Sequence, residues 1–113
     1  MHELGIMDSI LRTAFERSEE AGASRIHRIT LTIGSLSGVA PEALEFAFGA
    51  LTVDTAAEGA TLDIRRNDVR ITCAVCGAEY VPEAPVACCT VCGSPGGAIT
   101  TGREIELTSL EVS

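Results

Sequence analysis

The chain has 113 residues, which is enough for one domain or for one domain that carries a small insert. Its 16 acidic residues face 8 basic ones, all arginine, so the formal net charge is −8. Because binding to nucleic acid depends largely on cationic contacts with phosphates, this charge argues against nucleic acid and against an anionic membrane as partners. No apolar run could span a bilayer, and the first residues lack the pattern of a signal peptide. We therefore expect a cytoplasmic protein.

Hydrophobic periodicity predicts two helices and three strands. Residues 3 to 21 read as an amphipathic helix, and residues 28 to 33 alternate as a strand buried on one face. A second helix is predicted over 41 to 51, because proline suits the first helical position and Glu42 the positive helix end. Strands are expected over 60–66 and 104–112, and a shift of phase in the last is compatible with a bulge. The predicted buried helix positions are Leu4, Met7, Leu11, Ala14, Phe15, Leu44, Ala47, Phe48 and Leu51.

This order of elements predicts an α+β fold, with two helices on a small three-stranded sheet and an inserted four-cysteine zinc-ribbon module. We expect an α/β domain formed by residues 1–69 plus 101–113. Residues 70–100 form the inserted zinc-binding domain, which interrupts the sheet domain rather than following it.

All five cysteines fall within a short segment, and four of them form two pairs, Cys73-x2-Cys76 and Cys89-x2-Cys92. A two-residue spacing places both thiolates on one side of a tight turn, and two such turns complete the tetrahedron that zinc takes in closed structural sites. A glycine follows each pair, which lets the backbone fold back toward the sulfurs. The alternatives are two disulfides or a redox pair, but neither a secretion signal nor a thioredoxin-like unit supports them. Four thiolates leave no open position, so the predicted zinc is structural.

Cys88 is the remaining cysteine of this segment. A Cys88-x3-Cys92 register would break the two-residue turn, so we expect Cys88 to be a free thiol beside the site, with the other register left open. Tyr80 is the aromatic residue of the module and is expected to pack rather than to bind a ligand.

The amino terminus, Met1-His2-Glu3, carries a second set of metal donors. The Met1 amine, the His2 amide nitrogen and the His2 imidazole can close two adjacent chelate rings, and Glu3 can add its amide or carboxylate. Such a nitrogen-rich, near-planar set favours Ni(II) or Cu(II) over zinc. The simpler reading is that His2 is an exposed terminal residue. The other histidine, His27, is in phase with Ile29 and is expected to be a partly buried strand residue.

With the tripeptide and the cysteine pairs both in view, the chain resembles the HypA family, also called HybF, over nearly its whole length. The resemblance implies nickel binding at His2, assisted by the Met1 amine and Glu3, with delivery to the large subunit of nickel–iron hydrogenase together with a HypB-type GTPase, and in some organisms to urease. It also implies one structural zinc on Cys73, Cys76, Cys89 and Cys92. Two departures from the family pattern are Thr90, where proline is common, and the extra Cys88. The further matching segments are Ile33-Gly34, Gly38-Val39, Pro41-Glu42-x-Leu44, Phe46-x-Phe48, Gly102-Arg103-Glu104 and Leu110-Glu111-Val112.

Three hypotheses follow for the function. The first is a non-enzymatic nickel carrier, monomeric or weakly dimeric, with permanent zinc and labile nickel. The second is a zinc-ribbon adaptor for protein interaction that carries no nickel. The third is a metal-dependent hydrolase that uses His2 and Glu3, against which stand the lack of a second histidine at ligand spacing and of a phosphate-binding loop with its lysine.

Overall fold

The computed structural model of the chain describes residues 2–82, 88–95 and 97–113, and of His2 the backbone alone. The described residues divide into two compact units. We call the first, with residues up to 32, 38–65 and 106–113, the helical unit, and the second, with 33–37 and 66–105, the cysteine unit. The elements are α1 (His2–Glu20), β1 (Ile26–Gly34), α2 (Pro41–Leu51), β2 (Thr61–Asn67), β3 (Arg70–Thr72), β4 (Glu79–Tyr80), β5 (Ala98–Thr101) and β6 (Ile105–Val112).

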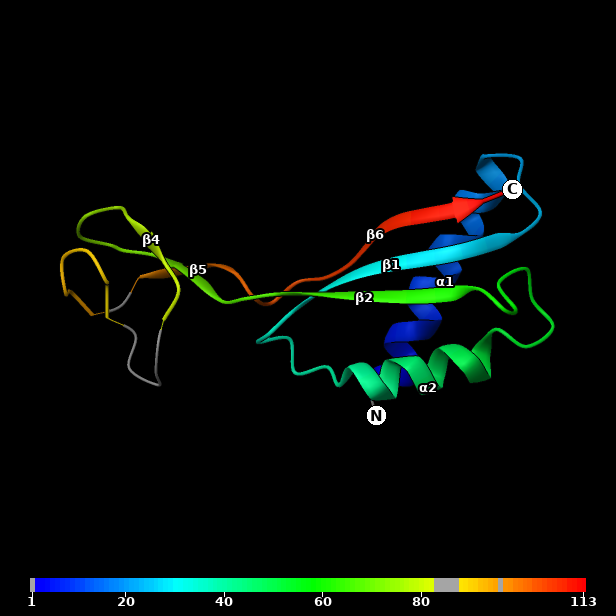
Figure 1. Cartoon of the computed structure of the whole chain (residues 1–113), viewed down its shortest axis with the longest axis horizontal. Coiled ribbons are helices and arrows are strands. Elements are labelled where there is room, and N and C mark those ends of the chain that lie inside the picture. The colour runs from blue at the N-terminus through cyan, green and yellow to red at the C-terminus, as the bar shows by residue number, and fades with distance from the viewer. Residues whose placement is uncertain (1, 83–87, 96) are drawn as a thin grey trace. The chain divides into compact units, whose positions relative to one another are not determined.

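Three strands form the sheet of the helical unit in the order β2-β1-β6. The Ser113 amide donates to the Arg25 carbonyl at one end, and the Gly34 amide donates to the Glu104 carbonyl at the other, so β1 and β6 run antiparallel. Figure 1 shows α1 crossing behind the strands and α2 running along the lower side of this unit. The predicted fold class, two helices on a small three-stranded sheet with a four-cysteine module, is confirmed.

The first helix follows its hydrophobic pattern except at its start. Met7, Leu11 and Ala14 are buried as predicted, and they recur at the spacing that places residues on one helix face. Leu4 was predicted to be buried, but 53% of its surface is exposed, because the first turn of α1 extends past the buried part of the helix. Within the described residues, no helix is long and apolar enough to cross a membrane.

The second helix begins at Pro41 and buries Leu44, Ala47 and Phe48. Leu51 is only partly buried. The helix ends where the Thr52 amide and hydroxyl both donate to the Phe48 carbonyl, at 3.1 and 2.7 Å. Because this hydroxyl is satisfied, Thr52 can be buried at little cost.

The central strand, β1, is buried along most of its length. Ile29, Leu31 and Ile33 are almost inaccessible, as expected for a strand covered by a helix. His27 was predicted to be partly buried, and this prediction is wrong, because its side chain is exposed. His27 follows the buried Ile26 near the start of the strand, and its Nε2 is 2.6 Å from the Ser113 hydroxyl.

Among its described residues, the cysteine unit contains three short strands, in the order β4-β3-β5, that the sequence did not predict. In β3, Ile71 lies opposite Tyr80 of β4 and opposite Ile99 of β5, and both pairings are antiparallel. Strands of two to four residues are too short for alternation of polar and apolar side chains to be recognised.

Within the cysteine unit, Gly34 is closely surrounded by the segment that contains Gly102 and Glu104. A Cβ at Gly34 would overlap the Gly102 carbonyl group and a Glu104 carboxylate oxygen. The Glu104 carboxylate accepts hydrogen bonds from the Gly102 amide at 2.6 Å and from the Asn67 side-chain amide at 3.1 Å. These bonds hold the two chain segments that enter and leave the three short strands.

Candidate metal centre

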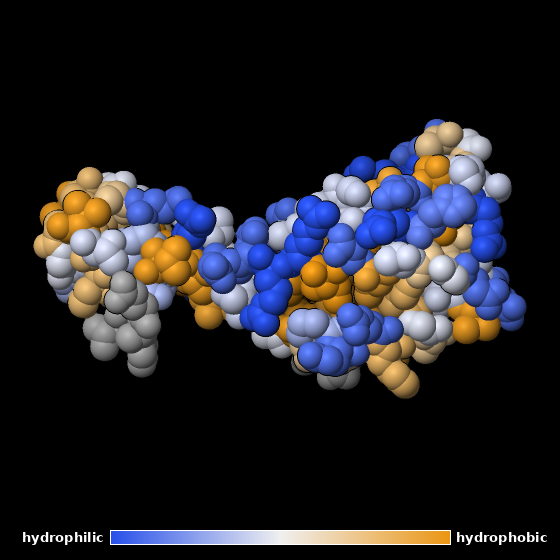
Figure 2. Space-filling model, in the orientation of Figure 1, coloured by the Kyte–Doolittle hydropathy of each residue, from blue (hydrophilic) through white to orange (hydrophobic). Residues whose placement is uncertain are grey.

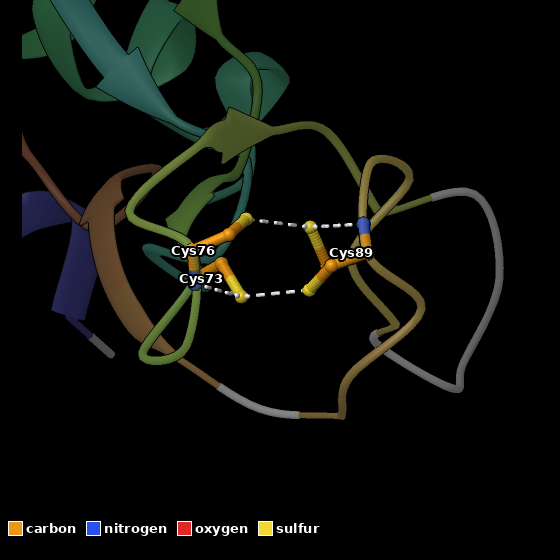
Figure 3. A group of neighbouring side chains, drawn as sticks. Cys73, Cys76 and Cys89 are labelled. Carbon is orange, nitrogen blue, oxygen red and sulfur yellow. Dashed lines mark hydrogen bonds between the residues drawn. The ribbon is translucent and has the colours of Figure 1, made fainter.

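Four cysteine sulfurs meet in the cysteine unit, and they all lie within 4.8 Å of one another. The Cys73 sulfur is 3.6 Å from that of Cys92, and the Cys76 sulfur is 3.6 Å from that of Cys89. Figure 3 shows the side chains of Cys73 and Cys76 pointing toward that of Cys89. The structure thus brings together four ligand atoms that could hold a metal ion.

The separation of the sulfurs fits a tetrahedral metal better than a disulfide. A disulfide bond holds two sulfurs about 2.05 Å apart. With zinc–sulfur bonds of about 2.3 Å, the corners of a tetrahedron are about 3.8 Å apart. The observed 3.6 Å lies close to the second value, and all five cysteines are free thiols. The donor set therefore fits zinc or another ion that accepts four thiolates.

The first pair forms a tight turn around the Cys73 sulfur. The amides of Val75 and Cys76 point at this sulfur, at 3.4 and 3.5 Å. The turn closes when the Gly77 amide donates to the Cys73 carbonyl at 3.0 Å. Gly77 has a φ of 76°, which glycine adopts without strain, as the sequence predicted for this position.

The second pair repeats this turn with nearly the same geometry. The amides of Val91 and Cys92 both lie 3.4 Å from the Cys89 sulfur, and the Gly93 amide donates to the Cys89 carbonyl at 2.9 Å. Both turns share the local sequence Cys-x-Val-Cys-Gly. Each turn supplies one buried sulfur, from Cys73 or Cys89, and one from an exposed residue, Cys76 or Cys92.

Hydrogen bonds from backbone amides and from one hydroxyl favour the charged form of two of these thiols. The amides of Cys92 and Val91 lower the pKa of Cys89, and the hydroxyl and amide of Ser94 lower the pKa of Cys92 to about 6. For Cys76, the Ala78 amide acts in the same direction, but burial and the neighbouring thiols outweigh it and raise the pKa to about 11. Thiolates are the form that binds metal, so these hydrogen bonds favour the ligand form of Cys89 and Cys92.

Two of the cysteines are also part of the small apolar core of their unit. Ile71, Cys73, Tyr80 and Cys89 form one buried cluster, with Val69 and Ala78 packed against it. Tyr80 is 4% exposed, and burial together with the nearby sulfurs raises the pKa of its hydroxyl. The expectation that Tyr80 is a packing residue is confirmed.

Cys88 lies outside the group of four. Its backbone pairs with that of Pro95 in an isolated antiparallel bridge, and its side chain is exposed. Among the described residues the convergent set contains Cys89 and not Cys88. The geometry therefore favours the Cys89-x2-Cys92 register.

Glu3 and the backbone of His2 lie in the helical unit. Met1 and the His2 side chain are outside the described residues, and α1 begins at His2. The Glu3 carboxylate accepts a hydrogen bond of 3.2 Å from the Ala40 amide. Ala40 is the N-cap of α2 and has no capping side chain of its own. Glu3 of α1 thus accepts the hydrogen bond of the N-cap amide of α2. In many helices an acidic residue in the first turn of the same helix accepts this bond.

Sequence reasoning missed two groups around these sites. Ser94, which stabilises the Cys92 thiolate, could have been found by aligning the two Cys-x-Val-Cys-Gly segments, because both continue with a small residue. The contact between Glu3 and Ala40 joins residues 37 positions apart. No local pattern in the sequence signals it.

Comparisons with known proteins agree with the geometry. A family model described as "Hydrogenase/urease nickel incorporation, metallochaperone, hypA" matches residues 1–112. Hydrogenase maturation factors HypA of Geobacter metallireducens and of a Picosynechococcus species are 40% and 41% identical to this chain, over 99% of both chains in each case.

Two solved structures share the fold. The Ni metallochaperone HypA of Helicobacter pylori aligns with a TM-score of 0.69 at 27% identity, covering 97% of this chain and 96% of the other. A solution structure of a HypA protein aligns with a TM-score of 0.79 at 29% identity, covering 100% of this chain and 97% of the other. On its sequence, its fold and its four-cysteine centre, the chain belongs to the HypA family of hydrogenase and urease nickel-incorporation metallochaperones.

Proposed function

We propose that this chain carries nickel for the maturation of nickel–iron hydrogenase, and that it binds Ni(II) at its amino terminus through the Met1 amine, His2 and Glu3. Membership of a nickel-incorporation family over residues 1–112 is the observation that carries this proposal. The chain acts as a carrier rather than as an enzyme, and urease is a second target of the same chemistry.

The backbone at the start of α1 suits the proposed donor set. The first amides of a helix have no carbonyl one turn earlier to accept their hydrogen bonds. Because α1 begins at His2, the His2 amide can release its proton to solvent and bind a metal through its nitrogen without breaking the helix. The Glu3 carboxylate is already bonded to the Ala40 amide, so the Glu3 contribution to nickel comes more readily from its backbone nitrogen.

The same position makes the nickel site weak, as a carrier requires. The N-terminal end of a helix carries a partial positive charge, which disfavours a bound cation. The charge of Glu3 in the first turn of α1 offsets part of this effect. A nickel ion held in this way is released more easily than the ion in a closed cage of four thiolates.

The four-cysteine centre, in this proposal, holds one structural zinc on Cys73, Cys76, Cys89 and Cys92. Two turns whose amides point at the sulfurs, with S···S separations of 3.6 Å, support this assignment. The two metals are then bound by the two expected domains, one metal in each. Residues 1–69 plus 101–113 carry the labile nickel, and residues 70–100 carry the permanent zinc.

The partners follow from the family role. We expect a cytoplasmic protein, monomeric or weakly dimeric, that works with a HypB-type GTPase and the large subunit of hydrogenase. The net charge of −8 disfavours nucleic acid and anionic membranes as partners.

Nickel titration of protein that begins at Met1 tests this proposal. His2→Ala removes the imidazole, and a peptide tag before Met1 converts the amine into an amide. Either change is expected to weaken nickel binding at least about tenfold, or about 1.4 kcal/mol, while the zinc content stays at one per chain. Glu3→Gln serves as the matched variant and is expected to lose less, because its amide nitrogen survives.

The outcome separates the carrier from a zinc-ribbon adaptor. If neither the tag nor His2→Ala changes the nickel affinity, the nickel site is not at the amino terminus. If the untagged protein binds no nickel at all, the adaptor reading replaces the carrier.

A further inference from the structure

The second helix, α2, turns an apolar surface to solvent. Phe46 is 80% exposed, although a side chain of this type is usually buried in a soluble protein. Gly49 and Ala50, three and four residues further on, are also exposed and share its helix face. Val53, in the turn after the helix, is 57% exposed. We call Phe46, Gly49, Ala50 and Val53 the outer face of α2. In Figure 2, pale orange atoms project along the lower edge, where Figure 1 places this helix.

Gly49 has no role in the packing of its own unit. Glycine weakens an exposed helix interior relative to alanine. A Cβ at Gly49 would meet none of the described heavy atoms within 4 Å, apart from its own helix backbone. The chain therefore has room for a side chain here and does not use it. A glycine in such a place allows the backbone of another molecule to approach closely.

Acidic side chains border this apolar face. Glu42 and Glu45 are exposed on the same helix, and α2 contains no basic residue. Within the part of the chain that the structure describes, neither carboxylate forms an ion pair. An apolar strip with uncompensated negative charge beside it is complementary to an apolar strip with positive charge beside it.

We propose that the outer face of α2 is a docking surface for an amphipathic helix of a partner protein, one whose apolar face is flanked by lysine or arginine. Such a helix places its apolar side chains around Phe46, the single large anchor of the surface. Its backbone crosses α2 at Gly49, and its basic residues reach Glu42 and Glu45. This surface requires no bound nickel.

The surface lies on the same unit as the proposed nickel donors. The hydrogen bond between Glu3 and Ala40 joins the first turn of α1 to the start of α2. A helix that docks on the outer face therefore binds the unit that carries the amino terminus, and not the cysteine unit.

A synthetic peptide tests the proposal on the full chain. The probe is a helical peptide with one leucine face flanked by lysines, and the control peptide has glutamates in place of the lysines. We expect the lysine peptide to bind, and its amide chemical-shift changes to centre on residues 42–53. Phe46→Ser is expected to weaken binding at least about tenfold, and Glu42→Gln with Glu45→Gln to remove most of its salt dependence.

Gly49→Leu separates docking from folding, because the added side chain meets open space in the chain itself but obstructs the partner backbone. This variant is expected to melt no lower than the unmodified protein and yet to bind the peptide at least about tenfold more weakly. Leu36→Ser, which alters an exposed apolar residue of the cysteine unit, is the matched control and is expected to bind normally. His2→Ala is also expected to bind the peptide normally, so a failure of the nickel proposal is distinguished from a failure of this one.

Three results would overturn the proposal. The first is equal binding of the lysine and glutamate peptides, and the second is a set of shift changes centred outside α2. The third is a dimer in sedimentation that Phe46→Ser or Gly49→Leu dissociates, since the occupant of the face is then a second copy of this chain.

Discussion

The two units of this protein reach a folded state by different means. The helical unit buries Met7 and Leu11 of α1, Leu44 of α2 and Leu31 of β1, which is a conventional aliphatic core. The buried cluster of the cysteine unit contains Ile71, Cys73, Tyr80 and Cys89, so half of it consists of proposed metal ligands. Small units with so little apolar surface usually depend on a metal or on disulfides. Apolar burial therefore stabilises the first unit, and we expect metal binding to stabilise the second.

Removing one ligand is expected to have the largest effect on this contrast. Structural zinc contributes about 10–16 kcal/mol to small peptides with little other core. Cys76→Ser should therefore release the metal and disorder the cysteine unit, while α1 and α2 remain helical. Metal analysis with far-ultraviolet circular dichroism and amide NMR measures both halves of this statement. Complete loss of the helical signal would show that the units do not fold separately.

Replacing each of the neighbouring cysteines Cys88 and Cys89 by serine tests which of them is a metal ligand. Cys89→Ser should lose the metal or hold it loosely, because the Cys89 sulfur accepts two amides and belongs to the group of four. Cys88→Ser should keep one metal per chain, because its side chain lies outside that group. Zinc content after dialysis against a weak chelator distinguishes the two variants. A site emptied by Cys88→Ser alone would move the register by one residue.

The converse variant weakens the helical unit alone. Leu44 is completely buried, and replacing a buried leucine by alanine costs about 2–5 kcal/mol. Leu44→Ala should thus lower the melting temperature of the helical signal and leave the metal content unchanged. Val53→Ala is the matched control, because Val53 is 57% exposed. Loss of metal together with the helical signal in Leu44→Ala would contradict the separation of the two cores.

A methyl group added at Gly34 tests how closely this residue is packed against Gly102. The added Cβ would overlap the Gly102 carbonyl group, so Gly34→Ala should destabilise this unit by about 1–3 kcal/mol. The same change at Gly49 should stabilise α2 by up to about 1 kcal/mol, because the space there is open. Amide hydrogen exchange reports on the two sites separately. If the amides around Gly34 are protected from exchange equally well in Gly34→Ala and in Gly49→Ala, the packing around Gly34 is not restrictive.

The smallest expected effect is at Glu104. Its own backbone amide, the Asn67 side chain and the Gly102 amide all hold the pKa of this carboxyl below the ordinary value of 4.5. A lowered pKa in the folded state means that the charged form stabilises the fold at neutral pH and that this contribution disappears as the pH falls through the folded value. Glu104→Gln should therefore melt slightly lower at pH 7, and the difference should shrink on acidification. A difference that grows toward low pH would reverse the assigned direction.

Much of the helical unit could be predicted because its signals are local. The predicted helix over 3–21 is observed as His2–Glu20, and the strands predicted over 60–66 and 104–112 are observed as Thr61–Asn67 and Ile105–Val112. The errors lie at the margins of the core. Leu4 and His27 have the right periodicity and lie close to the ends of their elements, but their side chains are exposed.

The cysteine unit was predictable in a different way. The spacing of the four cysteines indicated that their sulfurs converge, because a two-residue turn imposes its own geometry. The strands β3, β4 and β5 were missed, because pairing of Ile71 with Tyr80 and Ile99 depends on where the metal turns bring the chain. The nickel site remains a prediction that rests on the first three residues and on the family.

The unequal burial of the four cysteine residues at the metal centre has a kinetic consequence. Cys73 and Cys89 are buried, whereas Cys76 and Cys92 are exposed. A competing chelator or an alkylating reagent therefore reaches the site first at the two exposed residues, Cys76 and Cys92. Metal exchange should therefore be stepwise, with Cys76 or Cys92 detaching while Cys73 and Cys89 still hold the ion. A tightly bound ion can then still be exchanged from the solvent side.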